Sequence, residues 1–201
     1  MAITINGSSN TITGLAVGGL PDGVVDTDML AANAVTVAKA SGSVKGITMS
    51  ELWRINTSFS ISAGFGDIDS NWEVADHYTS GSIGSSMTQS SGIFTFPSPG
   101  VYLIQFILGF YKSGVSRRYL GAGIEVTSDN SSYSQAAINY ASIANNTAST
   151  HQTAITNAIF DVTNTSTHKC KFYIANVDTI SIHGHTDANF SSAMFTRLGD
   201  S

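Results

Sequence analysis

The chain has 201 residues, a formal net charge of −5 at pH 7 and one cysteine. A single cysteine excludes an internal disulfide, and only 11 % of the residues are charged, where a typical soluble domain has about 25 %. Nucleic-acid binding needs clustered Lys and Arg, and a membrane-spanning helix needs an apolar run about twice as long as any in this chain, so we expect neither. The N-terminal residues also lack the basic and apolar segments of a signal peptide.

The first 47 residues contain no Phe, Tyr or Trp, and a segment without aromatic side chains rarely builds a core of its own. Residues 3–5 and 11–13 flank Asn6-Gly7 in the manner of a hairpin, and Asp26-Thr-Asp28 would cap a short helix over residues 29–32. Residues 1–47 are therefore either a disordered leader or an extended arm that becomes ordered against neighbouring molecules. We favour an anchoring arm, with apolar contacts made by Leu15, Val17, Leu20, Met29 and Leu30.

The rest of the chain shows many short strand-like runs separated by turn residues, and no segment has the 3.6-residue period of a helix. Strands at a spacing of roughly 8–12 residues are typical of a sandwich or jelly roll. We therefore expect residues 48–201 to form an all-β head, a two-sheet antiparallel jelly-roll sandwich. The expected strands cover residues 52–61, 71–78, 92–96, 101–111, 118–126, 136–143, 153–162, 170–175, 179–183 and 193–198.

Residues 101–110 follow the turn Pro97-Ser-Pro-Gly100 and are apolar on both faces of the strand that they predict. Successive side chains of a strand point to opposite sides, so this strand needs cover on both, from its own core and from a second sheet or a second subunit. One face carries Tyr102, Ile104, Phe106, Leu108 and Phe110, and the other carries Val101, Leu103 and Ile107. The pattern leaves open which face meets a neighbour. We assign a subunit interface to Tyr102, Ile104, Phe106 and Leu108, with Phe195 from the last strand.

The pattern Gly92-x-Phe94-x-x-Pro97-x-x-Gly100-Val-Tyr102-x-x-x-Phe106 resembles the central signature of complement q-type globular heads, which are relatives of the tumour necrosis factor jelly rolls. The ending, Phe190-Ser-Ser-Ala-Met-Phe-Thr-Arg-Leu198, is similar to the closing strand of that family. The resemblance implies a ten-stranded jelly roll assembled as a compact homotrimer. It also implies that one face of residues 101–110 lies at or near the threefold axis.

Residues 14–23, Gly-Leu-Ala-Val-Gly-Gly-Leu-Pro-Asp-Gly, and the following residues 28–36 resemble leader segments of tailed-phage fibre and virion proteins. This resemblance implies a structural, non-enzymatic virion protein that is assembled in the host cytoplasm. In the first reading it is a trimeric tail fibre whose arm binds the tail, baseplate or capsid and whose head binds a glycan or protein of the host surface. The alternative is a capsid decoration spike with no host-binding role. A secreted complement-like module and a glycan-cleaving enzyme are less well supported.

The sequence contains no pattern that predicts catalysis or a cofactor. The nucleophile pattern G-x-S-x-G is absent. A glycan-cleaving enzyme needs two carboxylates that face one cleft, but acidic residues are sparse, and Glu51, Glu73 and Glu125 are the only glutamates. Asp67-Ile-Asp69-Ser-Asn71 opens like a calcium loop, but Trp72 and Tyr78 stand where that loop requires Gly and Glu. We therefore expect no cofactor and no enzymatic activity.

Two further groups of residues are candidates for binding. His183 and His185 would lie on the same side of a strand, as weak candidates for metal ligands beside Asp187. A pair of hydrogen-bonded interface histidines is the plainer interpretation. Tyr119, Tyr133 and Tyr140 fall near strand ends or loops, where tyrosines make adaptable contacts, and are our candidates for receptor contact.

Overall fold

The computed structural model describes residues 4–6, 8, 11–13, 46–77, 80–114 and 116–201. The chain divides into two compact units, Met1–Ser41 and Gly42–Ser201. In the first unit β1 (Thr4–Asn6) pairs antiparallel with β2 (Thr11–Thr13), which confirms the predicted hairpin. The short helix expected over residues 29–32 lies outside the described residues. So do the anchoring side chains assigned to the arm, Leu15, Val17, Leu20, Met29 and Leu30.

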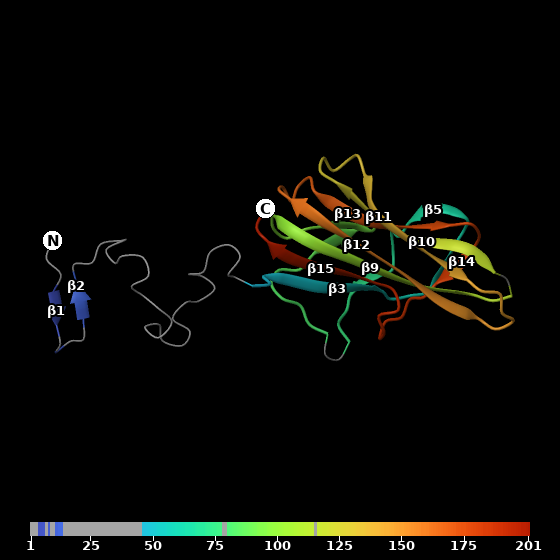
Figure 1. The fold of residues 1–201 in the computed structure, drawn as a ribbon, viewed down its shortest axis with the longest axis horizontal. Coiled ribbons are helices and arrows are strands. Elements are labelled where there is room, and N and C mark those ends of the chain that lie inside the picture. Colours follow the sequence, from blue (N-terminus) through green and yellow to red (C-terminus); the bar gives the residue numbers. More distant parts are fainter. Residues whose placement is uncertain (1–3, 7, 9–10, 14–45, 78–79, 115) are drawn as a thin grey trace. The chain divides into compact units, whose positions relative to one another are not determined.

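The second unit is a sandwich of two antiparallel sheets (Figure 1). One sheet has seven strands in the order β4–β14–β9–β15–β3–β6, with β12 pairing β9 on its other edge. The described part of the chain contains no helix, and therefore none long and apolar enough to cross a membrane. The strands of the seven-stranded sheet are β3 (Met49–Ile55), β4 (Phe59–Ile61), β6 (Trp72–Val74), β9 (Gly100–Lys112), β12 (Thr150–Val162), β14 (Ile180–Ile182) and β15 (Ser192–Gly199).

The other sheet has six strands in the order β11–β10–β13–β8–β7, with β5 also pairing β13. Both sheets are built from strands that are distant in the sequence, as in a jelly roll, so the predicted fold class is confirmed. The strands of the six-stranded sheet are β5 (Gly64–Asp67), β7 (Thr88–Ser90), β8 (Ile93–Thr95), β10 (Arg117–Thr127), β11 (Ser134–Ile143) and β13 (Lys169–Asn176).

Aromatic rings fill the space between the sheets. The Phe94 ring centre lies 5.3 Å from those of Trp53 and Trp72, 5.4 Å from that of Phe172 and 5.1 Å from that of Phe195. Edge-to-face and tilted pairs at these distances add about 0.5–1.5 kcal/mol each to the apolar burial. Because these residues come from five strands of the two sheets, this one cluster fixes how the sheets stack.

The glycines of the signature are required by backbone geometry. Gly92 has a φ of +75°, and a Cβ atom there would lie 2.2 Å from the carbonyl oxygen of Ile68. Gly100 has a φ of +145°, and a Cβ atom there would lie 2.4 Å from Nε of Arg197. Beyond the turn, the Tyr102 hydroxyl donates a hydrogen bond to the carbonyl oxygen of Ser98 at 2.9 Å. The signature thus specifies the turn that precedes β9, which lies in the middle of its sheet.

Candidate subunit interface and neighbouring sites

The residues that we assigned to the subunit interface lie in the core of a single chain. Tyr102, Ile104, Phe106, Leu108 and Phe195 each have 0 % exposure. Phe106 lies 4.7 Å from Phe172 of the opposite sheet, measured between ring centres. Side chains enclosed in this way cannot contact a second subunit, so this interface assignment is wrong. The first face of β9 is covered by the six-stranded sheet, and the face that remains is the one that carries Leu103 and Ile107.

The opposite side of β9 is half-exposed and belongs to a wider surface, which we call the outward face. Two cross-strand rows run over β3, β15, β9 and β12 without a charged side chain. Ile155 on β12, next to Ile107, is 47 % exposed, and Ile159, opposite Leu103, is 69 % exposed. One row is Ser50, Thr196, Leu103 and Ile159, and the other is Leu52, Met194, Gln105 and Asn157.

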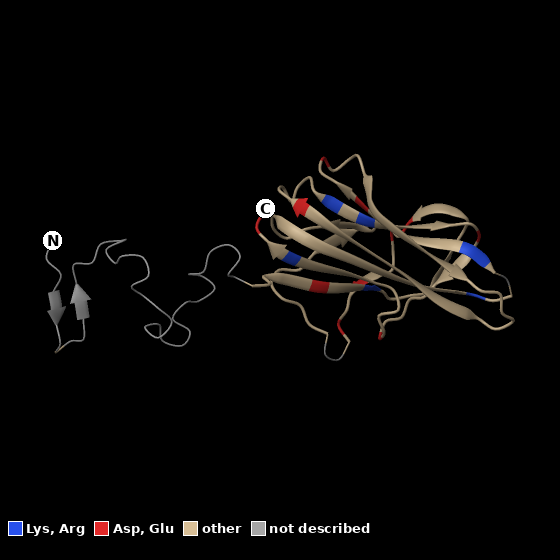
Figure 2. Ribbon diagram, viewed as in Figure 1, with Lys and Arg blue, Asp and Glu red and all other residues tan. Residues whose placement is uncertain are grey.

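Charged residues stand at the margins of the outward face. Lys112 is the only charged residue of β9 and Asp161 the only one of β12, each near an end of its strand. Figure 2 shows the long middle strands almost without charge, with Lys and Arg mostly toward strand ends and on the other sheet. A neutral surface with exposed isoleucines is typical of a protein–protein contact, because identical copies meet there without like-charge repulsion.

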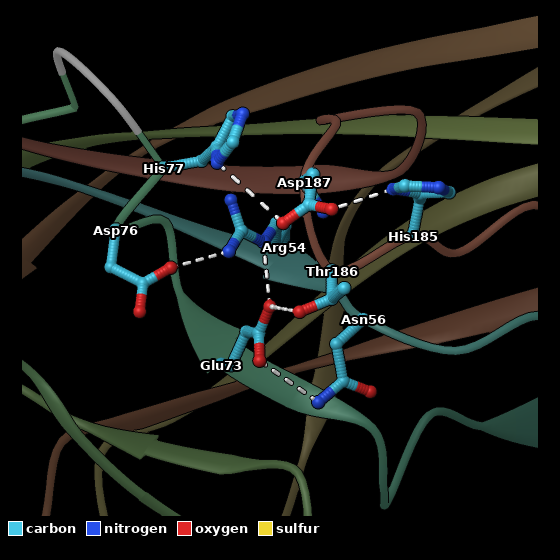
Figure 3. A network of polar contacts seen from close by, with 8 residues as sticks. All are labelled: Arg54, Asn56, Glu73, Asp76, His77, His185, Thr186 and Asp187. Atoms are coloured by element: carbon cyan, nitrogen blue, oxygen red, sulfur yellow. Dashed lines mark hydrogen bonds and ion pairs between the residues drawn. The ribbon is translucent and has the colours of Figure 1, made fainter.

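A buried arginine lies at one margin of the outward face (Figure 3). Arg54 on β3 is 1 % exposed, and its guanidinium donates to Glu73 at 2.7 Å and to Asp76 at 2.5 Å. Burial alone would lower the pKa of Arg54, but hydrogen bonds and charge from Glu73 and Asp76 outweigh it and raise this pKa. Glu73 also accepts hydrogen bonds from Asn56 at 3.1 Å and Thr186 at 3.4 Å. The network ties β3 and β6 to the segment after β14.

Two of the three tyrosines proposed for receptor contact lie together on the six-stranded sheet. The rings of Tyr119 on β10 and Tyr140 on β11 are 5.2 Å apart at 81°, and Tyr140 is 51 % exposed. The Arg118 guanidinium lies 5.2 Å from the Tyr119 ring centre. Tyr133 lies apart from them, with the ammonium of Lys171 4.7 Å from its ring centre. The structure thus supports a Tyr119–Tyr140 pair and separates Tyr133 from it.

An exposed aromatic residue on the same sheet was not anticipated. Phe65 on β5 is 80 % exposed and lies 6.1 Å from Tyr173 of β13, measured between ring centres. Its strand is only four residues long and contains two glycines, so neither length nor alternation could predict it from the sequence.

The two histidines of the weak metal candidate do not share a strand face, because β14 ends at Ile182. His185 accepts a hydrogen bond at Nδ1 from the backbone of Asp187 at 2.9 Å. The His183 ring stacks on Phe190 at 3.8 Å and 4°, and its nearest imidazole in ring contact is His151 of β12, at 5.5 Å. Burial, followed by the charges of His151 and His185, lowers the pKa of His183. Within the described ranges no group of three or more His, Cys, Asp or Glu is arranged to hold a metal ion.

No protein-family model and no curated protein sequence matches this chain. Among solved structures, it is similar to the Eiger TNF of S. frugiperda, with a TM-score of 0.57 at 14 % identity over 78 % of this chain and 95 % of that chain. It is also similar to murine APRIL at pH 8.5, with a TM-score of 0.51 at 10 % identity over 75 % of this chain and 99 % of that chain. At such identities the likeness concerns the fold alone. The unit Gly42–Ser201 therefore shares the jelly-roll fold of these tumour necrosis factor-like structures.

Proposed function

We propose that this chain is a structural, non-enzymatic protein of a bacteriophage particle. Three copies of the jelly-roll unit form a head through their outward faces, residues 1–47 anchor this head to the tail, baseplate or capsid, and the head contacts the host surface. The observation that carries the proposal is the neutral outward face, with Ile159 69 % exposed beside Leu103.

A homotrimer gives this face the cover that a neutral, partly apolar surface needs. Burying the exposed parts of Ile155 and Ile159 contributes about 1 kcal/mol for each side chain, and the same gain recurs at every contact of a closed ring. The face is also continuous, because its rows cross four neighbouring strands. The tumour necrosis factor-type fold and the resemblance to complement q-type heads are both consistent with threefold assembly.

A structural role agrees with the positions of the three glutamates. Glu51 accepts hydrogen bonds from the Trp53 indole and from the backbone of Met87, both at 2.8 Å. Glu73 is held by Arg54, and Glu125 lies 3.0 Å from the Lys171 ammonium. Each is engaged in holding strands together, which supports a non-enzymatic protein. The phage assignment is supported by the resemblance of residues 14–36 to virion leader segments.

Host contact is assigned to the solvent side of the six-stranded sheet, because a head assembled through the seven-stranded sheet leaves that side open. The Tyr119–Tyr140 pair, in which Tyr140 is exposed and Tyr119 is partly buried, provides rigid rings on regular strands, with the cation of Arg118 beside it. Side chains of this kind are frequent at the centre of recognition surfaces. This observation favours the fibre over a decoration spike that has no host-binding role.

The proposal is tested by a pair of matched charge substitutions in the full chain. Ile155 on the outward face is 47 % exposed, and Ile93 on β8, which faces solvent on the six-stranded sheet, is 36 % exposed. We expect Ile155→Glu to convert the trimer to monomers without loss of β-structure, and Ile93→Glu to remain trimeric, by light scattering after size exclusion. A trimer that survives Ile155→Glu, or an unmodified chain that is monomeric, would overturn the proposal.

A further inference from the structure

A hollow of about 290 Å³ lies where β9 changes its neighbour from β15 to β14. Gly109 is one of its lining residues, and the backbone N–H of His183 donates to the carbonyl oxygen of Gly109 at 2.9 Å. His151 and Thr153 of β12 line one side, and His183 and Phe190 line the other. The hollow lies near one end of β9, and Met49, the first residue of β3, lies near the other end.

The two imidazoles of this hollow are held by stacking. The His183 ring lies on Phe190 at 3.8 Å, and the His151 ring lies on Tyr111 at 5.3 Å and 29°. The Tyr111 ring on β9 also contacts the His183 ring, with 5.4 Å between ring centres, so Tyr111 packs against both imidazoles. The two imidazole centres are 5.5 Å apart. They come from two different segments, and the packing of each ring limits its rotation.

These rings differ from the other histidines in their polar contacts. His168 is within hydrogen-bond distance of the hydroxyls of Thr163 at 3.3 Å and Thr167 at 3.1 Å, and His185 accepts from the Asp187 backbone. His77 lies 3.5 Å from the Asp187 carboxylate. Within the described residues, no hydrogen bond or ion pair involves a ring nitrogen of His151 or His183. Two imidazoles thus line one hollow, and their ring nitrogens have no hydrogen-bond or ion-pair partner among the described residues.

From this arrangement we propose that His151 and His183 together bind one divalent transition-metal ion of the zinc class, with water completing its coordination. Zinc takes imidazole nitrogen at about 2.0–2.1 Å, so two imidazoles on one tetrahedral ion have ring centres about 5 Å apart. The observed 5.5 Å is close to that separation. None of the described residues that line the hollow carries a carboxylate, which disfavours calcium and magnesium because these ions require oxygen ligands.

The bound ion would join the beginning of β12 to the segment after β14, which lie on opposite sides of β9. Binding to the folded chain alone stabilises it in proportion to the logarithm of the metal concentration. The site is complete within one chain, so it does not depend on the proposed trimer.

The test is calorimetric titration of the full chain, prepared without a histidine tag, with zinc chloride and separately with calcium chloride at pH 7.5. We expect one zinc ion per chain, no calcium binding, and an affinity at least about tenfold lower in both His151→Gln and His183→Gln. His168→Gln, on the β12–β13 connection, is the matched control and should bind as the unmodified chain does. Circular dichroism verifies that each variant is folded.

Three results would overturn the assignment. They are no saturable zinc binding by the unmodified chain, unchanged affinity in both folded hollow variants, and loss of binding in His168→Gln. Should either hollow variant fail to fold, zinc titration of the unmodified chain followed by the imidazole NMR signals decides the matter. Selective shifts of His151 and His183 support the site, and shifts confined to other histidines contradict it.

Discussion

Ile159 of β12 lies directly opposite Leu103 of β9, on the side of the sheet that faces away from the core. One residue further along β9, Ile104 has 0 % exposure, whereas Ile159 is 69 % exposed. The two sides of one strand thus have opposite environments although both are apolar. This contrast separates the residues that stabilise the fold from those that are available for assembly.

Substitution on the two sides of β9 should therefore affect different equilibria. We expect Phe106→Ala to lower the free energy of unfolding by about 3–5 kcal/mol, because it leaves a cavity between the sheets. Leu103→Ala should lower the stability of the isolated fold by no more than about 1 kcal/mol and should weaken association instead. Urea unfolding followed by fluorescence gives the first quantity, and sedimentation over a range of concentrations gives the second. An equal loss of stability in both variants would show that the outward face is part of a core.

The face of β9 also marks the limit of what the sequence could predict. The signature turn and the all-β class follow from local patterns, because turn chemistry and the two-residue period are local properties. Which side of residues 101–110 points inward is not a local property, because both sides are apolar. It depends on the other sheet, from which Phe172 of β13 packs against Phe106, and Phe94 of β8 packs against Phe195.

Other differences between expectation and structure have similar causes. Residues 52–61 were expected to form one strand, but β3 ends at Ile55 and β4 begins at Phe59, since the two segments pair with different neighbours, β15 and β14. The short strands β5 and β7 have no apolar alternation that would predict them. The neighbour of His183 is His151, brought close by the pairing of β9 with both β12 and β14, and the sequence contains no signal of that contact.

The Arg54 network should stabilise the edge of the seven-stranded sheet. Arg54→Met removes the hydrogen bonds to Glu73 and Asp76 and should lower the free energy of unfolding by about 2 kcal/mol. Asp76 is itself largely solvated, with 80 % of its side chain exposed, so Asp76→Asn should cost less than about 1 kcal/mol. Thermal unfolding of the two variants side by side measures the difference. Equal effects would mean that Arg54 is held by packing of its aliphatic part rather than by its charge.

Tyr173 should make the protein sensitive to alkali. Burial, followed by the charge of Glu125, raises the pKa of Tyr173 to about 12, and its hydroxyl donates to Gln135. An unfolded tyrosine ionises near pH 10, so the stabilisation from this group is complete below that pH and is lost as the pH rises toward 12. Burial also raises the pKa of Tyr133, so ultraviolet titration of tyrosinate should show late ionisation that is reduced, but not abolished, in Tyr173→Phe. A titration curve unchanged by that substitution would contradict the assignment.

Cys170 should be chemically inert in the folded chain. Its side chain has 0 % exposure, and burial strongly raises the pKa of the thiol. Because the thiolate is the reactive form, a disulfide reagent at neutral pH should label the thiol only when the chain unfolds. The labelling rate in native buffer against that in denaturant provides the measurement. Comparable rates in the two conditions would show that β13 opens readily.

Anchoring and host contact should be separable on the particle. Deletion of residues 1–47 should leave a soluble trimer that no longer joins virions, because the outward face lies entirely in the jelly-roll unit. The double substitution Tyr119→Ala and Tyr140→Ala should leave the trimer and its incorporation intact while reducing adsorption to host cells. Virions carrying each form, compared by protein composition and by adsorption rate, provide the readout. Truncated chains found on particles would refute the anchoring role, and normal adsorption of the double variant would favour the decoration spike.

Sedimentation equilibrium of the unmodified chain at micromolar concentration tests the central claim most directly. The account predicts a folded species of three times the 21.1 kDa chain mass, with Ile155 and Ile159 protected from solvent. A folded, monodisperse species of one chain mass would contradict it, since the outward face would then be stable without any partner.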